Sequence, residues 1–377
     1  MEPIRFLVLG GGVNSAVGRV HRCALSLCER EIIILNGVFS RTESIQDESH
    51  RLWNARDKVT HKVAESLLHE YKASAKNIIV LVLLPSPDHF DKVILALSLG
   101  YSVICEKPGC TSHEQALIIR NYVTTNDCFF RTTFNYCGYP MLREIRSMLD
   151  SSRIGELRQV RIEMPQEGLV RPPLVQGAKQ APQKWRLSDG AIPTVCLDLG
   201  VHLYHMLVYL TGDQFDPVFS RFTNHTSYAK ILDTMNTLFT GRSTAIEGSM
   251  WITKSAIGYR NGLQVKIFGT EGSLAWKQTE SERIEYAPRR GHTQIIERGV
   301  DCVVAHQKRY ERMKPGHPAG FIEAFSNLYM DIADEYYMWK CDNQYKGHID
   351  THFLGIESVC DVMAFFDKCS SYIREKP

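Results

Sequence analysis

The 377-residue sequence lacks a long apolar run and carries almost no net charge. A membrane-spanning helix needs about 18 or more largely apolar residues, and no run approaches that length. The apolar residues 6–9 are too few for a signal-peptide core and run into glycines rather than a cleavage site. A net charge of +2 provides no basic field for nucleic acid. We therefore expect a cytoplasmic protein that binds neither nucleic acid nor membranes.

The eleven cysteines form no recognisable framework. An odd number without a Cys-x-x-Cys pair argues against both a set of disulfides and a zinc ribbon. We expect no metal site. The length instead suits two domains of ordinary size.

Apolar runs and helical patterns alternate over residues 1–135. The apolar runs are nearly continuous in Val, Ile and Leu, as expected when helices cover both faces of a parallel sheet. This alternation predicts an α/β fold that begins with a doubly wound Rossmann domain for dinucleotide binding. The expected strands are 5–9, 32–39, 78–84, 102–105 and 128–132, and the expected helices are 17–28, 61–71, 87–99 and 111–125.

The pattern changes in residues 136–377, which predict an α+β domain for substrate binding and oligomerisation. Its large, mainly antiparallel sheet is expected from a strand at 157–164 and alternating strands from about 218 to 276. A loop rich in Pro, Gly and Gln covers 165–182, and helices are expected at 139–151, 198–211, about 321–336 and about 352–373. One face of such a sheet is not obviously covered by these helices, which favours a homo-oligomer, either a dimer or a tetramer.

A glycine-rich turn follows the first expected strand. Gly10 and Gly12 match the first two glycines of the dinucleotide fingerprint, which allow a tight turn and a close approach of the pyrophosphate to a helix N-terminus. Ser15 occupies the third position, so the strict pattern fails, and Gly18 can take the helix-packing role if the turn is longer. We predict cofactor contacts from the turn, namely Gly10, Gly12, Val13, Asn14 and Ser15.

Two other strand ends carry charged residues. Glu106-Lys107-Pro108 follows the strand at 102–105, and an ammonium at that place can reach a substrate hydroxyl beside the nicotinamide. Ser40-Arg41 follows the second strand, where NAD-specific sites usually have an acidic residue. Because a guanidinium suits a 2′-phosphate, the cofactor is expected to be NAD or NADP, with a weak lean to NADP. The alternative for both segments is a solvated turn.

The helix at 198–211 places Asp198, His202 and His205 on one stripe at helical spacing. An Asp four residues before a His can orient it, which makes His202 a good general acid or base. Three readings remain open: a polar face with satisfied histidines, a metal site, or the substrate site of a dehydrogenase. The glycine turn and the strand-end lysine favour the third.

Together these residues resemble the glucose–fructose oxidoreductase, inositol dehydrogenase and MocA family of NAD(P)-dependent oxidoreductases. The likeness covers nearly the whole chain, and its motifs occur in the family's order: the glycine turn, Ser86-Pro87-Asp88-His89, Glu106-Lys107-Pro108 and Asp198-Leu199-Gly200-Val201-His202. The lengthened turn ending in Val20-His21-Arg22 is similar to one subgroup. Asp91 departs from the family, which often has a histidine there, and this puts one cofactor contact in doubt.

The resemblance implies hydride transfer between a nicotinamide and a secondary alcohol of a sugar, sugar derivative or cyclitol. It implies that Lys107, Asp198 and His202 are catalytic, with Asp198 orienting His202 and Lys107 contacting the reacting oxygen. Further cofactor contacts are expected from Ser40, Arg41, Pro85, Ser86, Pro87, His89, Glu106 and Lys107. Substrate contacts are expected from Asn135, Tyr136, Trp185, Arg186, His205 and His317, although core packing is an equal alternative for each aromatic residue.

Two other functions fit the same motifs. A dinucleotide-binding sensor would keep the glycine turn without turnover, and a lyase or hydrolase would use a tightly held NAD as an internal redox relay. The presence of Lys107, Asp198 and His202 together favours the dehydrogenase over both.

Overall fold

A computed structural model of the chain describes residues 2–57, 63–172, 174–175, 178–179, 181–300, 302–341 and 351–374. Contacts divide the chain into two compact units. The first unit consists of Met1–Gly138 and Phe321–Cys360, and the second of Tyr139–Gly320 and Asp361–Pro377. The segment from Phe321 to Cys360 thus packs with the N-terminal part, whereas the sequence assigned it to the C-terminal domain. The roles predicted for the two domains stay predictions.

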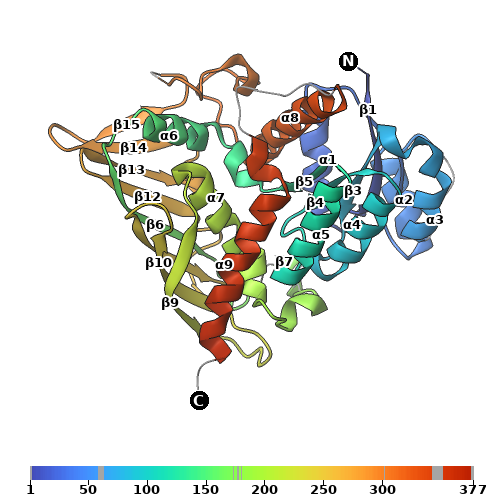
Figure 1. Cartoon of the computed structure of the whole chain (residues 1–377), viewed down its shortest axis with the longest axis horizontal. Coiled ribbons are helices and arrows are strands. Elements are labelled where there is room, and N and C mark those ends of the chain that lie inside the picture. Colours follow the sequence, from blue (N-terminus) through green and yellow to red (C-terminus); the bar gives the residue numbers. More distant parts are fainter. Residues whose placement is uncertain are drawn as a thin grey trace. The chain divides into compact units, whose positions relative to one another are not determined.

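The first unit contains a five-stranded parallel sheet, as predicted, in the order β2-β1-β3-β4-β5 (Figure 1). Its strands are nearly continuous apolar runs, and every residue of β3 is buried, because helices shield both faces. The strands are β1 (Ile4–Gly10), β2 (Ile32–Val38), β3 (Ile78–Leu83), β4 (Ser102–Glu106) and β5 (Phe130–Thr133). The helices are α1 (Ala16–Ser26), α2 (Glu43–Leu52), α3 (Ala64–Glu70), α4 (His89–Ser98), α5 (His113–Thr125) and, from the later segment, α8 (Phe321–Lys340).

Helix α2 does not coincide with any helix expected from the sequence. Its sequence is polar except for Ile45 and Leu52, and its buried side chains are Gln46 and Ser49 rather than these apolar residues. A helix of this kind gives no apolar stripe, so hydrophobic periodicity does not reveal it. It begins after Thr42, directly beyond the end of β2.

Helix α8 is fixed to the rest of the first unit by ion pairs and by packing. Arg131 on β5 donates to Glu335 of α8, with Nε 2.7 Å from Oε2. Next to this pair, the rings of Phe129 and Tyr336 meet edge to face with their centroids 5.2 Å apart. At Gly138 there is no room for a side chain, because a Cβ would lie 2.0 Å from the carbonyl oxygen of Ala324.

The second unit contains an eight-stranded sheet in the order β15-β14-β13-β12-β6-β11-β10-β9. It is mainly antiparallel, as predicted, and the exception is the parallel pair β6–β11. The expected strands ended near 276, but the sheet continues into two further strands. The strands are β6 (Leu157–Pro165), β9 (Phe215–Thr223), β10 (Thr234–Gly241), β11 (Glu247–Thr253), β12 (Gln264–Gly269), β13 (Gly272–Lys277), β14 (Arg283–Pro288) and β15 (Gln294–Glu297). A separate hairpin joins β7 (Leu174–Val175) and β8 (Ala178–Lys179).

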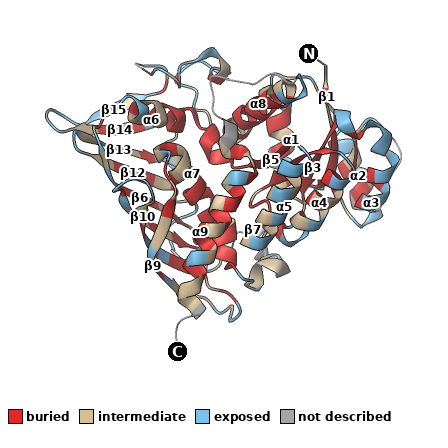
Figure 2. Ribbon diagram, in the orientation of Figure 1, coloured by how far each residue is buried: buried red, intermediate tan, exposed pale blue. Residues whose placement is uncertain are grey.

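Helices α6 (Pro140–Asp150) and α7 (Val201–Thr211) contact this sheet, and the C-terminal part of α9 (Ile356–Arg374) packs on α7. Figure 2 shows α7 as a largely buried element, and its residues 201–207 are all buried. Phe365 of α9 stacks on Tyr204 of α7, with ring centroids 4.3 Å apart. Helix α7 is therefore a core element of its unit.

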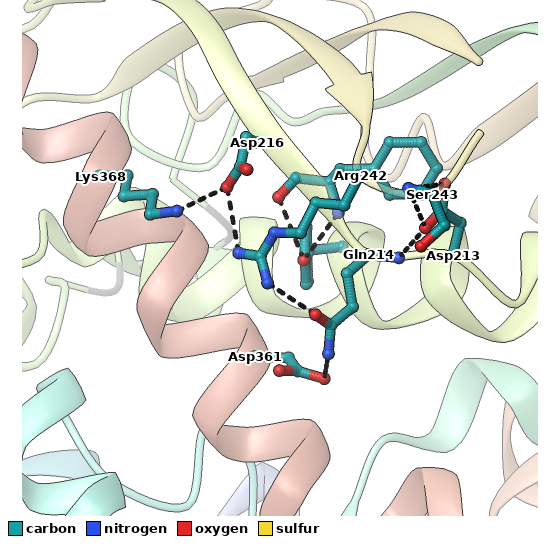
Figure 3. A network of polar contacts seen from close by, with 9 residues as sticks. Asp213, Gln214, Asp216, Arg242, Ser243, Asp361 and Lys368 are labelled. Carbon is teal, nitrogen blue, oxygen red and sulfur yellow. Dashed lines mark hydrogen bonds and ion pairs between the residues drawn. The ribbon is translucent and has the colours of Figure 1, made fainter. Parts of the chain in front are cut away.

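Polar contacts tie α9 to one end of the sheet (Figure 3). Lys368 of α9 donates to Asp216 of β9 at 2.6 Å, and Arg242 donates to the same carboxylate at 3.0 Å. Gln214, directly before β9, donates to Asp361 of α9 at 2.7 Å. Because these charges pair within the unit, we assign this network to structure rather than to ligand binding.

Short 3-10 turns complete the described structure. They lie at Lys72–Asn77, Ser86–Asp88, Asn135–Gly138, Lys184–Leu187, Gln278–Glu280, Lys308–Tyr310 and Thr351–Leu354.

Candidate functional site

The predicted cofactor residues of the first unit all follow strands of one parallel sheet. Ligands of open α/β sheets bind at the carboxyl ends of the strands, where the strand order reverses. Here the order reverses between β1 and β3. The glycine turn follows β1, Ser40 and Arg41 follow β2, residues 85–89 follow β3, and Glu106 ends β4 directly before Lys107. The topology of this unit therefore brings these segments to one edge of the sheet.

The glycine positions of this turn and of the start of α1 do not accommodate a side chain without strain or a clash. Gly10 and Gly11 have φ angles of +85° and +69°, a region that side chains disfavour. A Cβ on Gly12 would lie 2.9 Å from the carbonyl oxygen of Phe39, and one on Gly18 would lie 2.2 Å from the carbonyl oxygen of Gly11. Gly18 thus provides the close helix packing that the third fingerprint glycine usually provides.

Ser15, which stands at the usual position of that glycine, is the N-cap of α1. Its hydroxyl accepts a hydrogen bond from the Gly18 amide at 3.0 Å. Beside it, Asn14 is exposed and Val13 is half-buried. The helix N-terminus at this turn has the partial positive charge that attracts a pyrophosphate. Contacts from Val13, Asn14 and Ser15 to the cofactor remain predictions.

Helix α2, which the sequence analysis missed, holds the glycine turn in place. The Ser49 hydroxyl accepts from the Val13 amide at 2.9 Å. The indole of Trp53, just after α2, donates to the Gly11 carbonyl at 2.9 Å. Side chains of the protein itself therefore brace the turn.

The same helix also fixes the end of β2. The buried Gln46 side chain accepts from the amides of Phe39 and Ser40, at 2.7 and 3.0 Å. Its own amide group donates to the Gly37 carbonyl at 2.7 Å. Arg41, the next residue, is exposed. The amide of one glutamine thus sets the path of the chain where the adenine ribose is expected.

A pocket of about 250 Å³ lies beside this segment. Its apolar walls come from Leu9, Val38, Phe39, Val63, Ala64 and Leu84, and its polar lining from Ser40, Arg41, Glu65, Asp88, Asp91 and Lys92. Glu65 and Lys92 of this lining form an ion pair with each other. An apolar slot with a few polar groups at the end of β2 fits the adenosine half of a dinucleotide.

Within the described structure, two of the buried polar atoms that have no hydrogen-bond partner belong to predicted site residues of the first unit. They are Nδ1 of His89 and Nδ2 of Asn135. Nε2 of His89 lies 2.8 Å from the Leu84 carbonyl and donates to it, and burial lowers the pKa of His89, so the ring is neutral and Nδ1 is an acceptor. Buried polar groups are nearly always satisfied. An acceptor and a donor left in this way fit a site that a polar ligand completes.

The carboxylate of Glu106 is held by the protein itself. It is buried, lies 2.9 Å from Nε2 of His21, and accepts from the Thr133 hydroxyl. Burial opposes its ionisation, but the hydrogen bonds from His21 and Thr133 and the charge of Lys107 outweigh it and lower the pKa of Glu106. Its predicted contact with the cofactor stays a prediction. In the sequence His21 stands out only as part of the motif Val20-His21-Arg22. No sequence pattern indicates that it pairs with Glu106.

In the second unit, Asp198 does not belong to the same regular helix as His202. The sequence predicted one helix over 198–211, but Cys196–Gly200 forms a π-helical turn and α7 begins at Val201. The extra residue per turn shifts Asp198 away from the stripe that 100° per residue predicts. At Gly200 the π-helical turn packs closely on Phe366 of α9, because a Cβ at Gly200 would lie 2.5 Å from that ring.

Asp198 instead bonds two cations. Its Oδ2 lies 2.5 Å from Nη1 of Arg186, and the same oxygen pairs with the ammonium of Lys254. Arg186 also lies over the ring of Trp185, 4.4 Å from its centroid. The structure thus joins three predicted residues. It adds Lys254, which lies after β11, 56 residues beyond Asp198, and which carried no sequence signal.

The histidines of α7 are buried, so they do not form an exposed polar face. His202 is 7% exposed and His205 is 3% exposed. The other buried residues of their helix are Val201, Leu203, Tyr204, Met206, Leu207 and Leu210. Buried histidines in an apolar helix need polar partners, which favours a functional or network role over a solvated one.

The remaining predicted substrate residues lie in different surroundings. In the first unit Tyr136 is buried and packs edge-on against Phe321, with ring centroids 5.9 Å apart, which agrees with its core-packing alternative. In the second unit His317 is exposed, and its carbonyl accepts from Arg298 at 3.1 Å. Their substrate contacts remain predictions.

Within the described ranges, no group of three or more His, Cys, Asp or Glu residues could hold a metal ion. Over the same part of the chain, no helix is long and apolar enough to cross a membrane.

Comparison with known proteins gives matches along both halves of the chain. Residues 4–134 match the model of an oxidoreductase family with an NAD-binding Rossmann fold, and residues 142–275 match the GFO/IDH/MocA C-terminal domain. An uncharacterised oxidoreductase, YfiI of Bacillus subtilis, is 25% identical over 88% of this chain and 85% of its own length. The D-xylose 1-dehydrogenase [NADP(+)] of Haloarcula marismortui is 24% identical over 53% of this chain and 52% of its own.

Among solved structures, an inositol dehydrogenase homolog from Azotobacter vinelandii, complexed with NADH and myo-inositol, has the same fold. The TM-score is 0.86 at 23% identity, over 99% of this chain and 96% of the other. The two family models together cover most of the chain in the order expected from its motifs. The chain therefore belongs to the GFO/IDH/MocA family of oxidoreductases.

Proposed function

We propose that the protein is an NAD(P)-dependent oxidoreductase that acts on a secondary alcohol of a sugar, sugar derivative or cyclitol. The observation that carries this proposal is the braced glycine turn at the same sheet edge as Lys107, in a chain of this family. The names of relatives add the substrate class, since they include a D-xylose dehydrogenase and an inositol dehydrogenase homolog. When bound, the nicotinamide exchanges a hydride with the substrate carbon.

The chain's own residues hold and move the proton. Lys107 follows β4 and donates a hydrogen bond to the reacting oxygen, which stabilises the negative charge that develops there. His202 exchanges the hydroxyl proton as general acid and base. The half-buried Lys107 and the buried His202 both stand on regular elements of their own units, directly after β4 and in the first turn of α7. Such placement limits the positions that each group can take.

Asp198, paired with Arg186 and Lys254, sets the charge around α7's first turn. The two ion pairs hold this carboxylate in a fixed direction. We propose that this cluster orients substrate hydroxyls, with Arg186 as a donor. The homo-oligomer also remains a proposal, and it is supported by Phe219 and Leu238, which are exposed and lie opposite each other on β9 and β10.

Absorbance at 340 nm with a panel of sugars and cyclitols tests this function. We expect net formation of NADH or NADPH with at least one of them, and the panel includes myo-inositol and D-xylose. Turnover without any net reduced cofactor would instead show an internal redox relay. Binding of the dinucleotide without turnover of any compound would show a sensor.

Arg41→Ala tests which cofactor the pocket after β2 prefers. We propose that Arg41 binds the 2′-phosphate of NADP, so the variant should lose NADP affinity far more than NAD affinity. A lost charge-assisted hydrogen bond costs about 1.5–3 kcal/mol, or roughly 10- to 150-fold in Kd. Isothermal titration with each cofactor measures the difference, and Arg290→Ala, an exposed arginine of the second unit, is the control. Equal losses for both cofactors would show that Arg41 is a solvated turn residue.

A further inference from the structure

A buried chain of hydrogen bonds connects three elements of the first unit through one imidazole. His21 of α1 is fully buried. Its Nε2 lies 2.9 Å from Oε2 of Glu106 at the end of β4, and its Nδ1 lies 2.5 Å from the hydroxyl of Tyr329 on α8. Phe325 of α8 closes the site with its ring edge-on to the imidazole, at a centroid distance of 4.8 Å.

The direction of each hydrogen bond follows from the chemistry of the outer groups. An ionised Glu106 can only accept, so Nε2 of His21 carries the proton of the bond between them. In the tautomer with this single ring proton, Nδ1 is an acceptor and the Tyr329 hydroxyl donates to it. The Thr133 hydroxyl donates to the same carboxylate oxygen. Two donors therefore hold a buried Glu106 as a carboxylate.

The position of Glu106 beside Lys107 gives His21 a role beyond that of a core histidine with satisfied hydrogen bonds. Glu106 is the last residue of β4, it pairs in register with Thr133 of β5, and Lys107 follows it directly. A carboxylate fixed from both sides fixes the backbone from which Lys107 leaves the strand. His21 also lies about 9 Å along α1 from the cap residue Ser15, so the helix that starts at the glycine turn reaches the lysine strand.

We propose that His21 is a positioning residue for Lys107, acting through Glu106. The imidazole keeps Glu106 ionised and oriented, and Tyr329 keeps the imidazole in the tautomer that donates to Glu106. This inference rests on the proposed function for its effect on turnover, but the link between His21 and Glu106 can be measured without any cofactor.

The first measurement is thermal unfolding of the full chain without cofactor, between about pH 4 and pH 7. The groups that face Glu106 are His21 on α1, Tyr329 on α8, His89 at the start of α4, and its chain neighbours Cys105 and Lys107. In the wild type the pKa of Glu106 is lowered on folding, so its ionisation adds stability above its unfolded value of about 4.3 and this stability is lost as the pH falls.

In His21→Leu, burial acts on Glu106 without its main donor and raises the pKa. The unfolded chain then ionises more readily than the folded one, which lowers stability as the pH rises. The difference in Tm between wild type and variant should therefore widen by about 3 °C or more between pH 4 and pH 7. His69→Leu, at an exposed histidine of α3, is the control and should give a difference that does not change with pH.

The second measurement compares the effect of each variant on kcat with its effect on the cofactor KM. Displacing a catalytic group by about 1 Å can cost roughly 100-fold, so His21→Leu should reduce kcat by about 10- to 100-fold and change the cofactor KM much less. His21→Gln, whose amide can still donate to Glu106, should recover kcat to within about 3-fold of wild type. Tyr329→Phe, which removes the outer hydroxyl alone, should lie between them.

The outcomes separate this inference from the proposed function. A Tm difference that is the same at every pH would overturn the link to Glu106, and an unchanged kcat in His21→Leu would overturn the positioning role. If His21→Leu does not fold, Tyr329→Phe gives the same two tests with smaller expected effects, and His21→Gln remains the rescue variant. Absence of turnover in the wild type would overturn the proposed function and the role in turnover, while the pH dependence of Tm would still decide whether His21 holds Glu106.

Discussion

Replacing Lys107 or His202 by alanine is expected to reduce kcat by about 10²- to 10⁴-fold, which is the usual contribution of a positioned acid, base or oxyanion partner. Folding and dinucleotide binding should remain close to those of the wild type. Lys107 follows a strand whose own residues are held by β3 and β5. The glycine turn that we predict to bind the pyrophosphate is braced by Ser49 and Trp53, and neither Lys107 nor His202 takes part in that bracing. Steady-state kinetics at 340 nm and isothermal titration with the cofactor measure the two properties.

The double variant shows whether the two residues act in one step. Groups that share one proton transfer act as a unit, so the combined loss should be far smaller than the product of the single losses. Lys266→Ala and His225→Ala, at residues of the second unit that are exposed or half-exposed, are the matched controls and should have wild-type kcat. Near-normal turnover in either single variant would show that the strand-end lysine or the α7 histidine lies outside the reaction. Losses that multiply fully would place them in separate steps.

The features that were predictable from the sequence are those that depend on local patterns. The parallel strands are visible as continuous apolar runs, and the turn is visible because only glycine permits its φ angles and close contacts. The third fingerprint glycine is absent, but the sequence has Gly18 three residues further along, and Gly18 could be predicted to take its role. The family motifs then placed Lys107 at a strand end, where the structure has it.

The supporting residues were not predictable, and the reason is physical. Gln46, Ser49 and Trp53 brace two turns of the candidate site, but two of them are polar residues buried on a polar helix, so neither periodicity nor composition distinguishes them from solvated residues. The bonds from His21 to Glu106 and from Lys254 to Asp198 join residues 85 and 56 positions apart. Such pairs exist only once the chain has folded.

Asp198 shows a different limit. Its distance of four residues from His202 predicts a shared helical face, and this interpretation assumes 3.6 residues per turn. The π-helical turn at Cys196–Gly200 breaks that assumption. π-turns are rare and often lie at functional sites. Predictions that assume regular helical spacing are therefore least dependable at functional sites. The ion pairs of Asp198 with Arg186 and Lys254 now define its surroundings better than its spacing does.

Gly18→Ala is expected to weaken dinucleotide binding by at least about 10-fold. The added Cβ would lie 2.2 Å from the carbonyl oxygen of Gly11 and 2.6 Å from its Cα. Both are backbone atoms, so the contact is relieved only if α1 or the glycine turn moves. Trp53 holds that same carbonyl, at 2.9 Å, and a shifted turn would therefore also lose a buried hydrogen bond, with a lower Tm as the result.

Gly190→Ala is the matched control for this variant. Gly190 has nothing within 4 Å of an added Cβ, so its variant should keep both cofactor affinity and Tm. Isothermal titration gives Kd, and each tenfold loss corresponds to about 1.4 kcal/mol of binding free energy. Gly18→Ala with a lower Tm but wild-type affinity would mean that α1 shifts without disturbing the turn, and that the pyrophosphate does not depend on their contact. A loss of affinity in Gly18→Ala alone would show that the site is built on the close approach of α1 to Gly11, which is the structural role of the fingerprint glycine taken here by a residue three positions later.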